Sequence, residues 1–440
     1  MGPDQQPQID GFGLTFPFPI RIATLLVAGF WGWAINLHFL AKANIDVPAL
    51  IRYPSSTQRP HHASAYRLAT IFTIPLTLWL IVFWIVTHCQ FELVGRFDYI
   101  PQSVFIILLL ILIWPFNRAS RAGRIRLLLT LKRVAIGGLA ESHDGKFGDV
   151  LLADALTSYA RVLGDLYISF CMFFTDGLSA TSKPNRACGK DFIVPIIIAV
   201  PSAIRLRQCL TEYVRSRRTT SRRESSKGNQ HLANALKYST AFPVIYLTAT
   251  LRNYNPLDFH GFSEVTIMRL LFIFSCINSG YSFWWDVVKD WDFTLFSPNR
   301  LDRDHPYGLR RHRNFSSDRL YHYVIIADLA LRFSWLWRVI PGLTWLPETE
   351  SGLFLLMFLE VARRWMWVFF RVEAEWSKFY LSHLACNEPS ASQIRPGHYS
   401  FDFFGPIADH LFSCATVRNT QGPGLDDVLL GDFNHKFDAD

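Results

Sequence analysis

The stretch Phe262–Trp291, FSEVTIMRLLFIFSCINSGYSFWWDVVKDW, decides the predicted fold. Its apolar part is long enough to cross a bilayer as a helix, which takes about 20 residues. Its aromatic end carries Asp286 and Asp290, and their spacing places both carboxylates on one helix face. A carboxylate at membrane depth is costly, by about 2.5–3.5 kcal/mol on insertion scales. The stretch therefore predicts a membrane helix whose two acids face water or basic side chains of other helices.

The composition of the whole chain is typical of a membrane protein. Half of its 440 residues are hydrophobic, 15% are aromatic and only 18% are charged. The net charge of +8 would suggest a nucleic-acid partner in a soluble protein. Here it is better explained by the Lys and Arg that collect in cytosolic loops, so we expect no nucleic-acid partner. The first apolar run is too long for a cleavable signal and lacks a small-residue cleavage site.

We predict an all-α fold, a polytopic transmembrane helix bundle of about nine spans, with eight to ten as the range. The spans are expected at 20–41, 67–89, 101–117, 149–174, 191–213, 231–252, 262–291, 320–340 and 350–376. Residues 118–133 are basic on one side and Leu-rich on the other, which predicts an amphipathic interfacial helix. Pro195 and Pro201 are expected to break the fifth span.

The predicted organisation has four parts. A short lumenal tail (1–19) precedes the N-terminal membrane helices and the cytosolic amphipathic helix (20–148). The main transmembrane domain (149–376) follows, and a polar cytosolic tail (377–440) ends the chain.

Lys and Arg are divided unevenly between two sets of loops. One set holds 27 of them and the other holds 4. The larger set comprises 42–66, 118–148, 214–230, 292–319 and the tail from 371. The smaller set comprises 1–19, 90–100, 175–190, 253–261 and 341–349. Because basic residues favour the cytosolic side, the N-terminus is expected in the lumen and the C-terminus in the cytosol.

The seven cysteines are scattered and form no CxxC pair. We therefore predict reduced structural cysteines, with no disulfide framework and no metal site. GxSxG, HExxH, P-loop and GxGxxG motifs do not occur, so we predict neither an enzyme nor a cofactor. A membrane-embedded transferase, the alternative, would need a compact Asp-rich motif at one interface, and the sequence does not contain one.

Several basic side chains fall inside the predicted spans, where each needs a counter-charge or a bound anion. They are Arg205, Lys237, Arg332, Arg363 and Arg364. Phosphate suits a planar guanidinium with five donors, so we predict a phosphate site formed by Lys237, Arg332, Arg363 and Arg364.

Simpler explanations of the same residues remain open. Lys237 can reach the cytosolic interface. Asp328 can pair with Arg332, and Glu360 with Arg364, since each pair is four residues apart.

The embedded acids are predicted to balance these cations. Asp154 and Asp286 are expected to be the counter-charges, because a pore with only cations would hold an anion too tightly to release it. Asp290 can instead be an interfacial residue between Lys289 and Trp291. Trp335 lies one turn after Arg332 and can be either a gate or an ordinary packing residue.

Six segments, in this order, resemble the EXS family of phosphate exporters and cover roughly residues 150–376. They are Leu152–Ser158 (LADALTS), Pro201–Leu210 (PSAIRLRQCL), Asn234–Thr240 (NALKYST), Trp285–Trp291 (WDVVKDW), Leu331–Trp335 (LRFSW) and Glu360–Glu373 (EVARRWMWVFFRVE). The resemblance implies that the phosphate path is lined by Asp154, Arg205, Lys237, Tyr238, Asp286, Asp290, Arg332, Arg363, Arg364 and Arg371, with Trp335 as the gate. Thr157 and Ala374 stand where the family usually has Asn.

The large exporters of the family carry a cytosolic SPX domain, which we do not expect here because only 19 residues precede the first span. The short form resembles the fungal Erd-type ER-retention proteins. That resemblance implies a Golgi membrane protein that returns phosphate, a by-product of glycosylation, from the lumen to the cytosol. Its expected partners are inorganic phosphate, membrane lipids and glycosyltransferases or their sorting adaptors. The alternative is a Golgi scaffold that retains glycosyltransferases without transporting anything.

Overall fold

The computed structural model describes a large part of the chain in detail. The described residues are 11–51, 61–115, 120–137, 145–175, 179, 181–186, 188–189, 191–218, 222–255, 262–297, 306–315, 317–338 and 348–387. The chain divides into two compact units, Met1–Leu384 and Ala385–Asp440, and the contacts reported below lie in the first.

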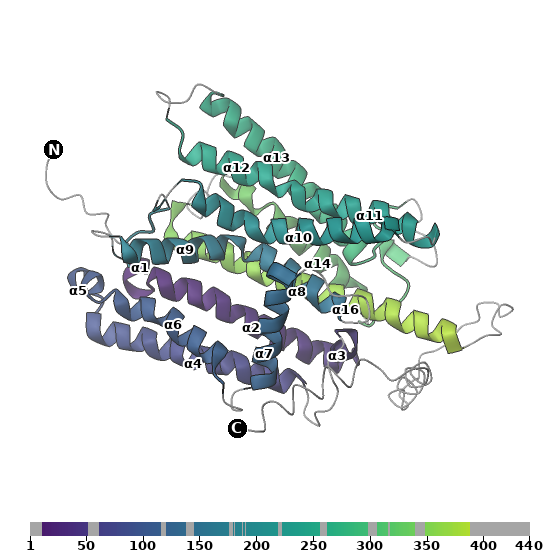
Figure 1. The fold of residues 1–440 in the computed structure, drawn as a ribbon, viewed down its shortest axis with the longest axis horizontal. Helices are drawn as coiled ribbons and strands as arrows, with labels where there is room; N and C mark the ends of the chain where they lie inside the picture. The colour runs from purple at the N-terminus through teal and green to yellow at the C-terminus, as the bar shows by residue number, and fades with distance from the viewer. Residues whose placement is uncertain are drawn as a thin grey trace. The chain divides into compact units, whose positions relative to one another are not determined.

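The described residues fold into helices and contain no β-strand, which confirms the predicted all-α class (Figure 1). The first half comprises α1 (Gly11–Thr15), α2 (Phe18–Lys42), α3 (Val47–Leu50), α4 (His61–Thr87), α5 (Phe91–Arg96), α6 (Tyr99–Ile113), α7 (Arg121–Lys132), α8 (Lys146–Ser158) and α9 (Ala160–Phe174). The second half comprises α10 (Ile193–Arg218), α11 (Arg222–Ser239), α12 (Ala241–Arg252), α13 (Glu264–Trp285), α14 (Asp318–Arg332) and α16 (Glu350–Asn387). Single turns follow three of these helices: π-turns at Arg133–Gly137 and Asp286–Asp290, and a 3-10 turn at Ser334–Arg338.

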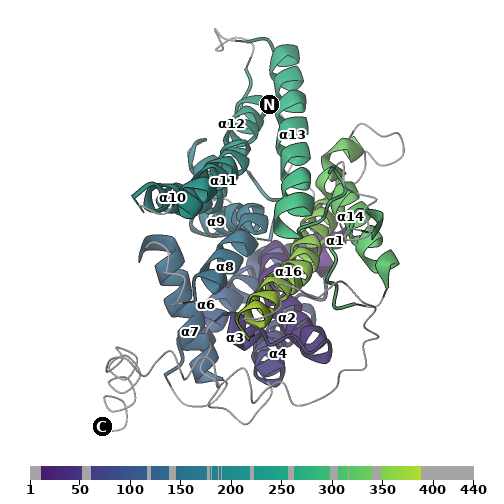
Figure 2. The same cartoon turned by 90° about the vertical axis from the view of Figure 1, so that its right-hand side faces the viewer.

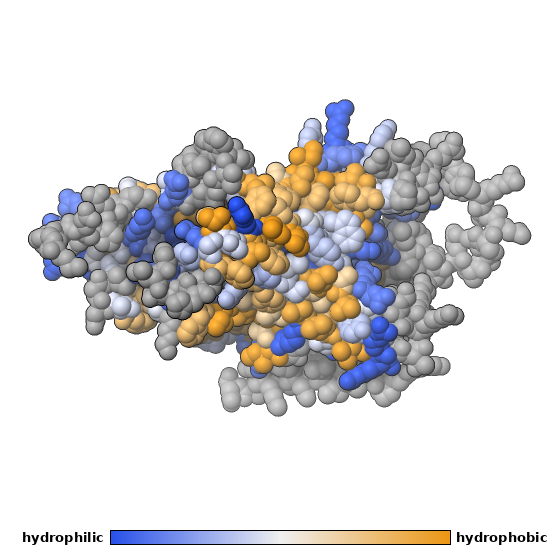
Figure 3. Space-filling model, turned by 90° about the horizontal axis from the view of Figure 1, so that it is seen from above, coloured by the Kyte–Doolittle hydropathy of each residue, from blue (hydrophilic) through white to orange (hydrophobic). Residues whose placement is uncertain are grey.

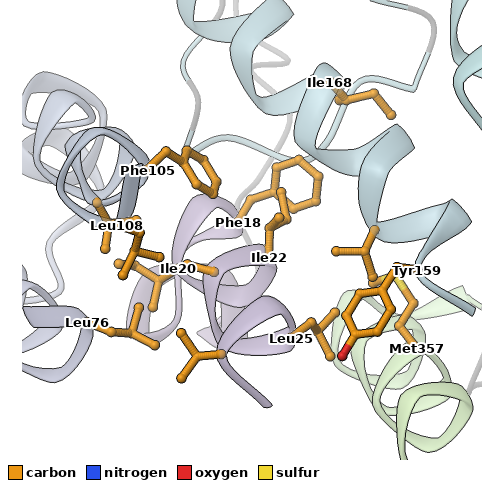
Figure 4. Packing of buried hydrophobic residues seen from close by; sticks show 14 of the residues in the cluster. Phe18, Ile20, Ile22, Leu25, Leu76, Phe105, Leu108, Tyr159, Ile168 and Met357 are labelled. Atoms are coloured by element: carbon orange, nitrogen blue, oxygen red, sulfur yellow. The ribbon is translucent and has the colours of Figure 1, made fainter. Parts of the chain in front are cut away.

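Helix α2 is the centre of the N-terminal packing. It contacts α4, α6 and α9, and its residues Phe18, Ile20, Ile22 and Leu25 are almost completely buried (Figure 4). The same cluster also contains residues of α4, α6, α9 and α16, and Met357 is one of those from α16. The apolar faces of these four helices therefore meet around α2.

Two glycines of α2 allow α9 and α16 to approach closely. A methyl group at Gly29 would overlap the hydroxyl group of Tyr159, and one at Gly32 would overlap the indole ring of Trp365. The side chain of Asn36, one turn later, donates to the backbone carbonyl of Trp365 at 2.8 Å. Since Trp365 follows Arg363 and Arg364, this contact fixes the part of α16 that carries the predicted site.

Four helical segments are long and apolar enough to cross a membrane among the described residues. They are Phe18–Lys42, His62–Thr87, Ile193–Arg218 and Glu264–Asp290. Apolar side chains cover much of the middle of the face seen in Figure 3. The exposed apolar side chains of α13 include Phe272, Ile273 and Ile277. The protein is thus a multi-pass membrane protein. The number of spans, nine, stays a prediction.

Several predicted boundaries differ from the structure. The predicted fourth span is two helices that meet at Tyr159, and the sixth is two helices that meet at Thr240. Helix α10 runs unbroken from Ile193 to Arg218 and includes Pro201, so the predicted break is wrong. Proline removes one helical hydrogen bond and can be accommodated in a membrane helix when neighbouring groups compensate. Helix α16 reaches Asn387, so the polar tail begins later than residue 377.

The prediction that all cysteines are reduced is also wrong. A disulfide joins Cys171, near the end of α9, to Cys188 in the segment that follows, with the Cα atoms 6.1 Å apart. The 17-residue spacing gave no sign of this pairing, because it arises only when the segment after α9 folds back against the helix. Cys89, Cys209 and Cys276 are free.

Candidate functional site

Asp286 and Asp290 face the same cation, as their spacing predicted. Lys237 of α11 donates to Asp286 Oδ1 at 3.0 Å and to Asp290 Oδ2 at 3.4 Å. The two acids lie in a π-turn, in which the Trp291 amide donates to the Asp286 carbonyl. Such turns are rare and occur often at functional sites. Lys237 is 7% exposed and ion-paired, so it does not reach the interface as an isolated charge.

Asp286 and Asp328 join α11, α13, α14 and α16 through shared ion pairs. Asp286 accepts from Lys237 and also from Arg332 of α14. Arg332 donates through Nε to Asp328 at 2.9 Å, and Asp328 accepts a further bond from Arg363 of α16 at 2.9 Å. Both acids are fully buried. The turn after α13 therefore meets α14 through Arg332 and α16 through the contact of Asp290 with Arg371, and Figure 2 shows this end of α13 beside both helices.

Arg363 is bound by carboxylates on two sides. Besides Asp328, it forms a bidentate pair with Glu360 at 2.9 and 2.6 Å. The sequence interpretation paired Glu360 with Arg364 instead, and this is wrong. At a spacing of three residues Glu360 reaches Arg363, while Arg364 points toward α8.

Arg364 has a different kind of environment. Its Nε donates to Ser158 Oγ at 2.8 Å and its Nη2 donates to Thr157 Oγ1 at 3.1 Å. Its guanidinium carbon lies 4.7 Å from the centre of the Trp367 ring. It is 6% exposed and forms no ion pair within 4.0 Å with the described residues. A guanidinium has five N–H donors, and these hydroxyls occupy two of them.

Asp154 neutralises a cation other than the predicted ones. Its Oδ1 accepts from Arg205 Nε at 2.6 Å and from the hydroxyl of Tyr238. The Arg205 guanidinium lies 4.9 Å from the centre of the Tyr238 ring and donates to Gln208 at 2.6 Å. Asp154 was expected to balance Lys237 and the arginines of α14 and α16, but α8 and α10 bring it to Arg205.

Two further predicted residues lie at the edge of this group. Arg371 is 3.7 Å from Asp290 and donates to Glu375 at 2.9 Å. Trp335 lies in the 3-10 turn after α14, and its Nε1 donates to Ser279 Oγ at 3.0 Å. Its ring contacts Phe272 edge-on, with the centroids 5.4 Å apart. This position is compatible with both a gate and a packing role.

We call this set of charged residues the central network. Its cations are Arg205, Lys237, Arg332, Arg363, Arg364 and Arg371, and its acids are Asp154, Asp286, Asp290, Asp328, Glu360 and Glu375. The six positive and six negative charges balance. Buried charges require such pairing, because desolvation of an unpaired ion costs several kcal/mol.

Comparisons with known proteins place the chain in a family. The pattern that defines the EXS family matches residues 16–377. The chain belongs to the EXS family. It is 31% identical over 376 residues to Protein ERD1 homolog 1 of Schizosaccharomyces pombe, which covers 82% of this chain and 91% of that protein.

Two other relatives are longer proteins. SPX and EXS domain-containing protein 1 of Dictyostelium discoideum is 26% identical over 381 residues, which cover 84% of this chain and 38% of that protein. Solute carrier family 53 member 1 of Mus musculus is 29% identical over 287 residues, which cover 62% of this chain and 38% of that protein. The EXS match includes every member of the central network.

The structure adds residues that the sequence reasoning did not assign to the site. Ser158 and Thr157 bind Arg364, Gln208 binds Arg205, and Glu375 binds Arg371. The resemblance to the EXS family marks Thr157 only as a position where the family usually has Asn. Polar side chains on helices that carry embedded charges were the signal that could have identified Ser158 and Gln208.

Proposed function

We propose that this EXS protein transports inorganic phosphate across the Golgi membrane, from the lumen to the cytosol. The observation that carries the proposal is Arg364, a buried guanidinium whose side-chain partners are hydroxyls instead of carboxylates. Ser158 and Thr157 can donate as well as accept, so all three side chains can turn toward phosphate oxygens. Guanidinium and hydroxyl donors together suit a tetrahedral oxyanion.

The balance of the central network supports release as well as binding. In the arrangement observed, Asp328 and Glu360 occupy the donors of Arg363, and Asp286 is shared by Lys237 and Arg332. A phosphate must therefore displace carboxylates as it passes, which weakens its net binding. Conduction needs sites that attract an ion and also let it leave.

The relatives support transport and a place in the secretory pathway. One of them is named a solute carrier, and others carry the ERD1 name. In the Golgi lumen, the phosphate would come from nucleotides that glycosyltransferases release. Retention of ER lumenal proteins and of glycosyltransferases would then follow from a working glycosylation cycle. A pure scaffold has no need for a buried arginine whose hydrogen bonds among the described residues go to hydroxyls.

The test is phosphate release from sealed Golgi vesicles loaded with labelled inorganic phosphate. Vesicles that contain the chain should release phosphate faster than vesicles from cells that lack it. When cells that lack the chain are given the parental chain, phosphate release should be restored. Arg364→Ala at the same Golgi abundance should not restore it. Equal release from all these vesicles would contradict the proposal and favour the scaffold.

A further inference from the structure

A second charged cluster involves Arg186, which lies two residues before Cys188. Cys188 is bonded to Cys171 near the C-terminal end of α9. Arg21 of α2 donates to Glu350 Oε2 at 3.2 Å, and Arg186 donates to Glu350 Oε1 at 3.5 Å. Arg21 is 4% exposed and Glu350 is 8% exposed, whereas the Arg186 side chain keeps 29% of its surface. Two arginines from separate segments thus meet at one carboxylate, and the second of them remains accessible.

The disulfide holds Arg186 in this position. Cys188 follows Arg186 by two residues and is bonded to Cys171 of α9. The Asn185 amide contacts Met172 Sδ at 3.3 Å, and the Thr181 hydroxyl donates to the Val94 carbonyl at 3.1 Å. The segment is therefore fixed against the protein on both sides of Arg186. Disulfides persist in oxidising compartments, so this end of the molecule fits the lumenal side.

Asp165 of α9 interacts electrostatically with this cluster. Its charge interacts with those of Arg186, Arg21, Arg161 and Glu350. Clustered arginine side chains attract an anion, and hydrogen phosphate is one.

Asp165 adds an acceptor to these donors. It is 4% exposed, and its Oδ2 has no hydrogen-bond partner among the described residues. Buried polar atoms are normally hydrogen-bonded, so an unpartnered oxygen calls for an explanation. Hydrogen phosphate carries an O–H group that can donate to such an oxygen, while its other oxygens accept from arginines.

We propose that Arg186, Arg21 and Asp165 form a lumenal capture site that binds phosphate before it reaches the central network. This inference rests on the proposed function. Asp165 lies five residues after Ala160, the first residue of α9, which is about 8 Å along that helix. Ser158, which binds Arg364, is the last residue of the preceding helix α8, so phosphate released here is close to Arg364. The disulfide keeps Arg186 at the site, and Glu350 pairs with both Arg21 and Arg186 when phosphate is absent.

The test compares Arg186→Gln with Lys183→Gln in liposomes that contain the full chain, with inorganic phosphate as the probe. Lys183 is an exposed cation of the same segment and serves as the matched control. Arg186→Gln should raise the KM for phosphate about ten-fold and leave kcat unchanged. Lys183→Gln should change neither, and Arg186→Lys should recover part of the affinity, because it keeps the charge and loses the planar fork.

The Cys171→Ser/Cys188→Ser pair tests the role of the disulfide. It should raise KM about as much as Arg186→Gln, and the combined variant should show no further increase. An equal rise in KM for Arg186→Gln and Lys183→Gln would indicate only diffuse attraction and overturn the site. So would a parental KM for Arg186→Gln, or a loss of kcat alone. A parental chain without any phosphate flux would instead overturn the proposed function.

Discussion

Arg363 and Arg364 are neighbours in the chain but have opposite kinds of partners. Arg363 lies between two carboxylates, Asp328 and Glu360, whereas Arg364 contacts two hydroxyls and an indole ring. The first arginine neutralises buried acids, and the second keeps donors that an anion can use. On the proposed function, Arg363 therefore has a structural role and Arg364 a transport role.

This difference predicts different effects of alanine at the two positions. Arg363→Ala removes one of the two cations that pair with the buried Asp328 and leaves Glu360 without its bidentate partner. Breaking a buried pair costs about 3–5 kcal/mol. Arg364→Ala removes hydrogen bonds to hydroxyl groups that can rearrange, at about 0.5–1.5 kcal/mol each. Thermal unfolding of the purified variants should show a much larger drop in midpoint for Arg363→Ala. Equal drops would contradict this assignment.

At the residue scale, the sequence identified the embedded charges but not all of their partners. Depth in the membrane predicts the ion pair of Asp286 with Lys237, and spacing predicts that of Asp328 with Arg332. The structure contains both pairs. Asp154 with Arg205 depends on how α8 packs against α10, which spacing along one helix cannot provide. The same holds for Ser158 with Arg364, since 206 residues separate them.

At the scale of elements, α2 and α16 depend on a close approach. Gly32→Ala should lower the free energy of unfolding by about 1–3 kcal/mol, the usual cost of overpacking, because the added methyl group meets the Trp365 ring. Gly280→Ala in α13 is the matched control, since no heavy atom lies within 4 Å of its added Cβ. Thermal unfolding of both variants in detergent measures the difference. A Gly32→Ala variant as stable as Gly280→Ala would show that this contact does not support the fold.

The extension of α16 makes a prediction about truncation. Ser377 is buried and donates to the Glu373 carbonyl, and Trp376 stacks on Phe379 with the centroids 5.7 Å apart. A chain that ends after Asn387 should keep its phosphate flux, because the central network lies entirely before that point. A chain that ends after Trp376 should unfold at lower temperature. Flux and unfolding measured on both truncations decide this, and loss of flux in a folded, Golgi-located chain ending at Asn387 would contradict it.

Element boundaries could be predicted wherever hydropathy changes sharply. The start of α2 and the end of α4 lie within two residues of the predicted spans. The breaks at Tyr159 and Thr240 could not be predicted, because both lie inside continuous apolar or amphipathic runs. Each break directly follows residues of the site: Ser158 is the last residue of α8, and Lys237 lies two residues before the end of α11.

For the whole molecule, the uneven loop charges and the disulfide lead to the same orientation. The smaller set of basic loops includes 175–190, which contains Cys188, and an oxidising lumen suits its bond to Cys171. In sealed Golgi vesicles a C-terminal tag should be digested by added protease. A membrane-impermeant maleimide should label Cys171 and Cys188 only after reduction and permeabilisation. A protected C-terminal tag would reverse the orientation.

The most direct test of the central claim is phosphate flux through the purified chain in liposomes. The parental chain should carry inorganic phosphate at a rate well above that of protein-free liposomes. Arg364→Ala should lower the apparent affinity about ten- to a hundred-fold, as expected for the loss of a charge-assisted hydrogen bond worth about 1.5–3 kcal/mol. Arg364→Lys should restore only part of it. Flux by folded Arg364→Ala equal to that of the parent, or no flux by the folded parent, would contradict the account.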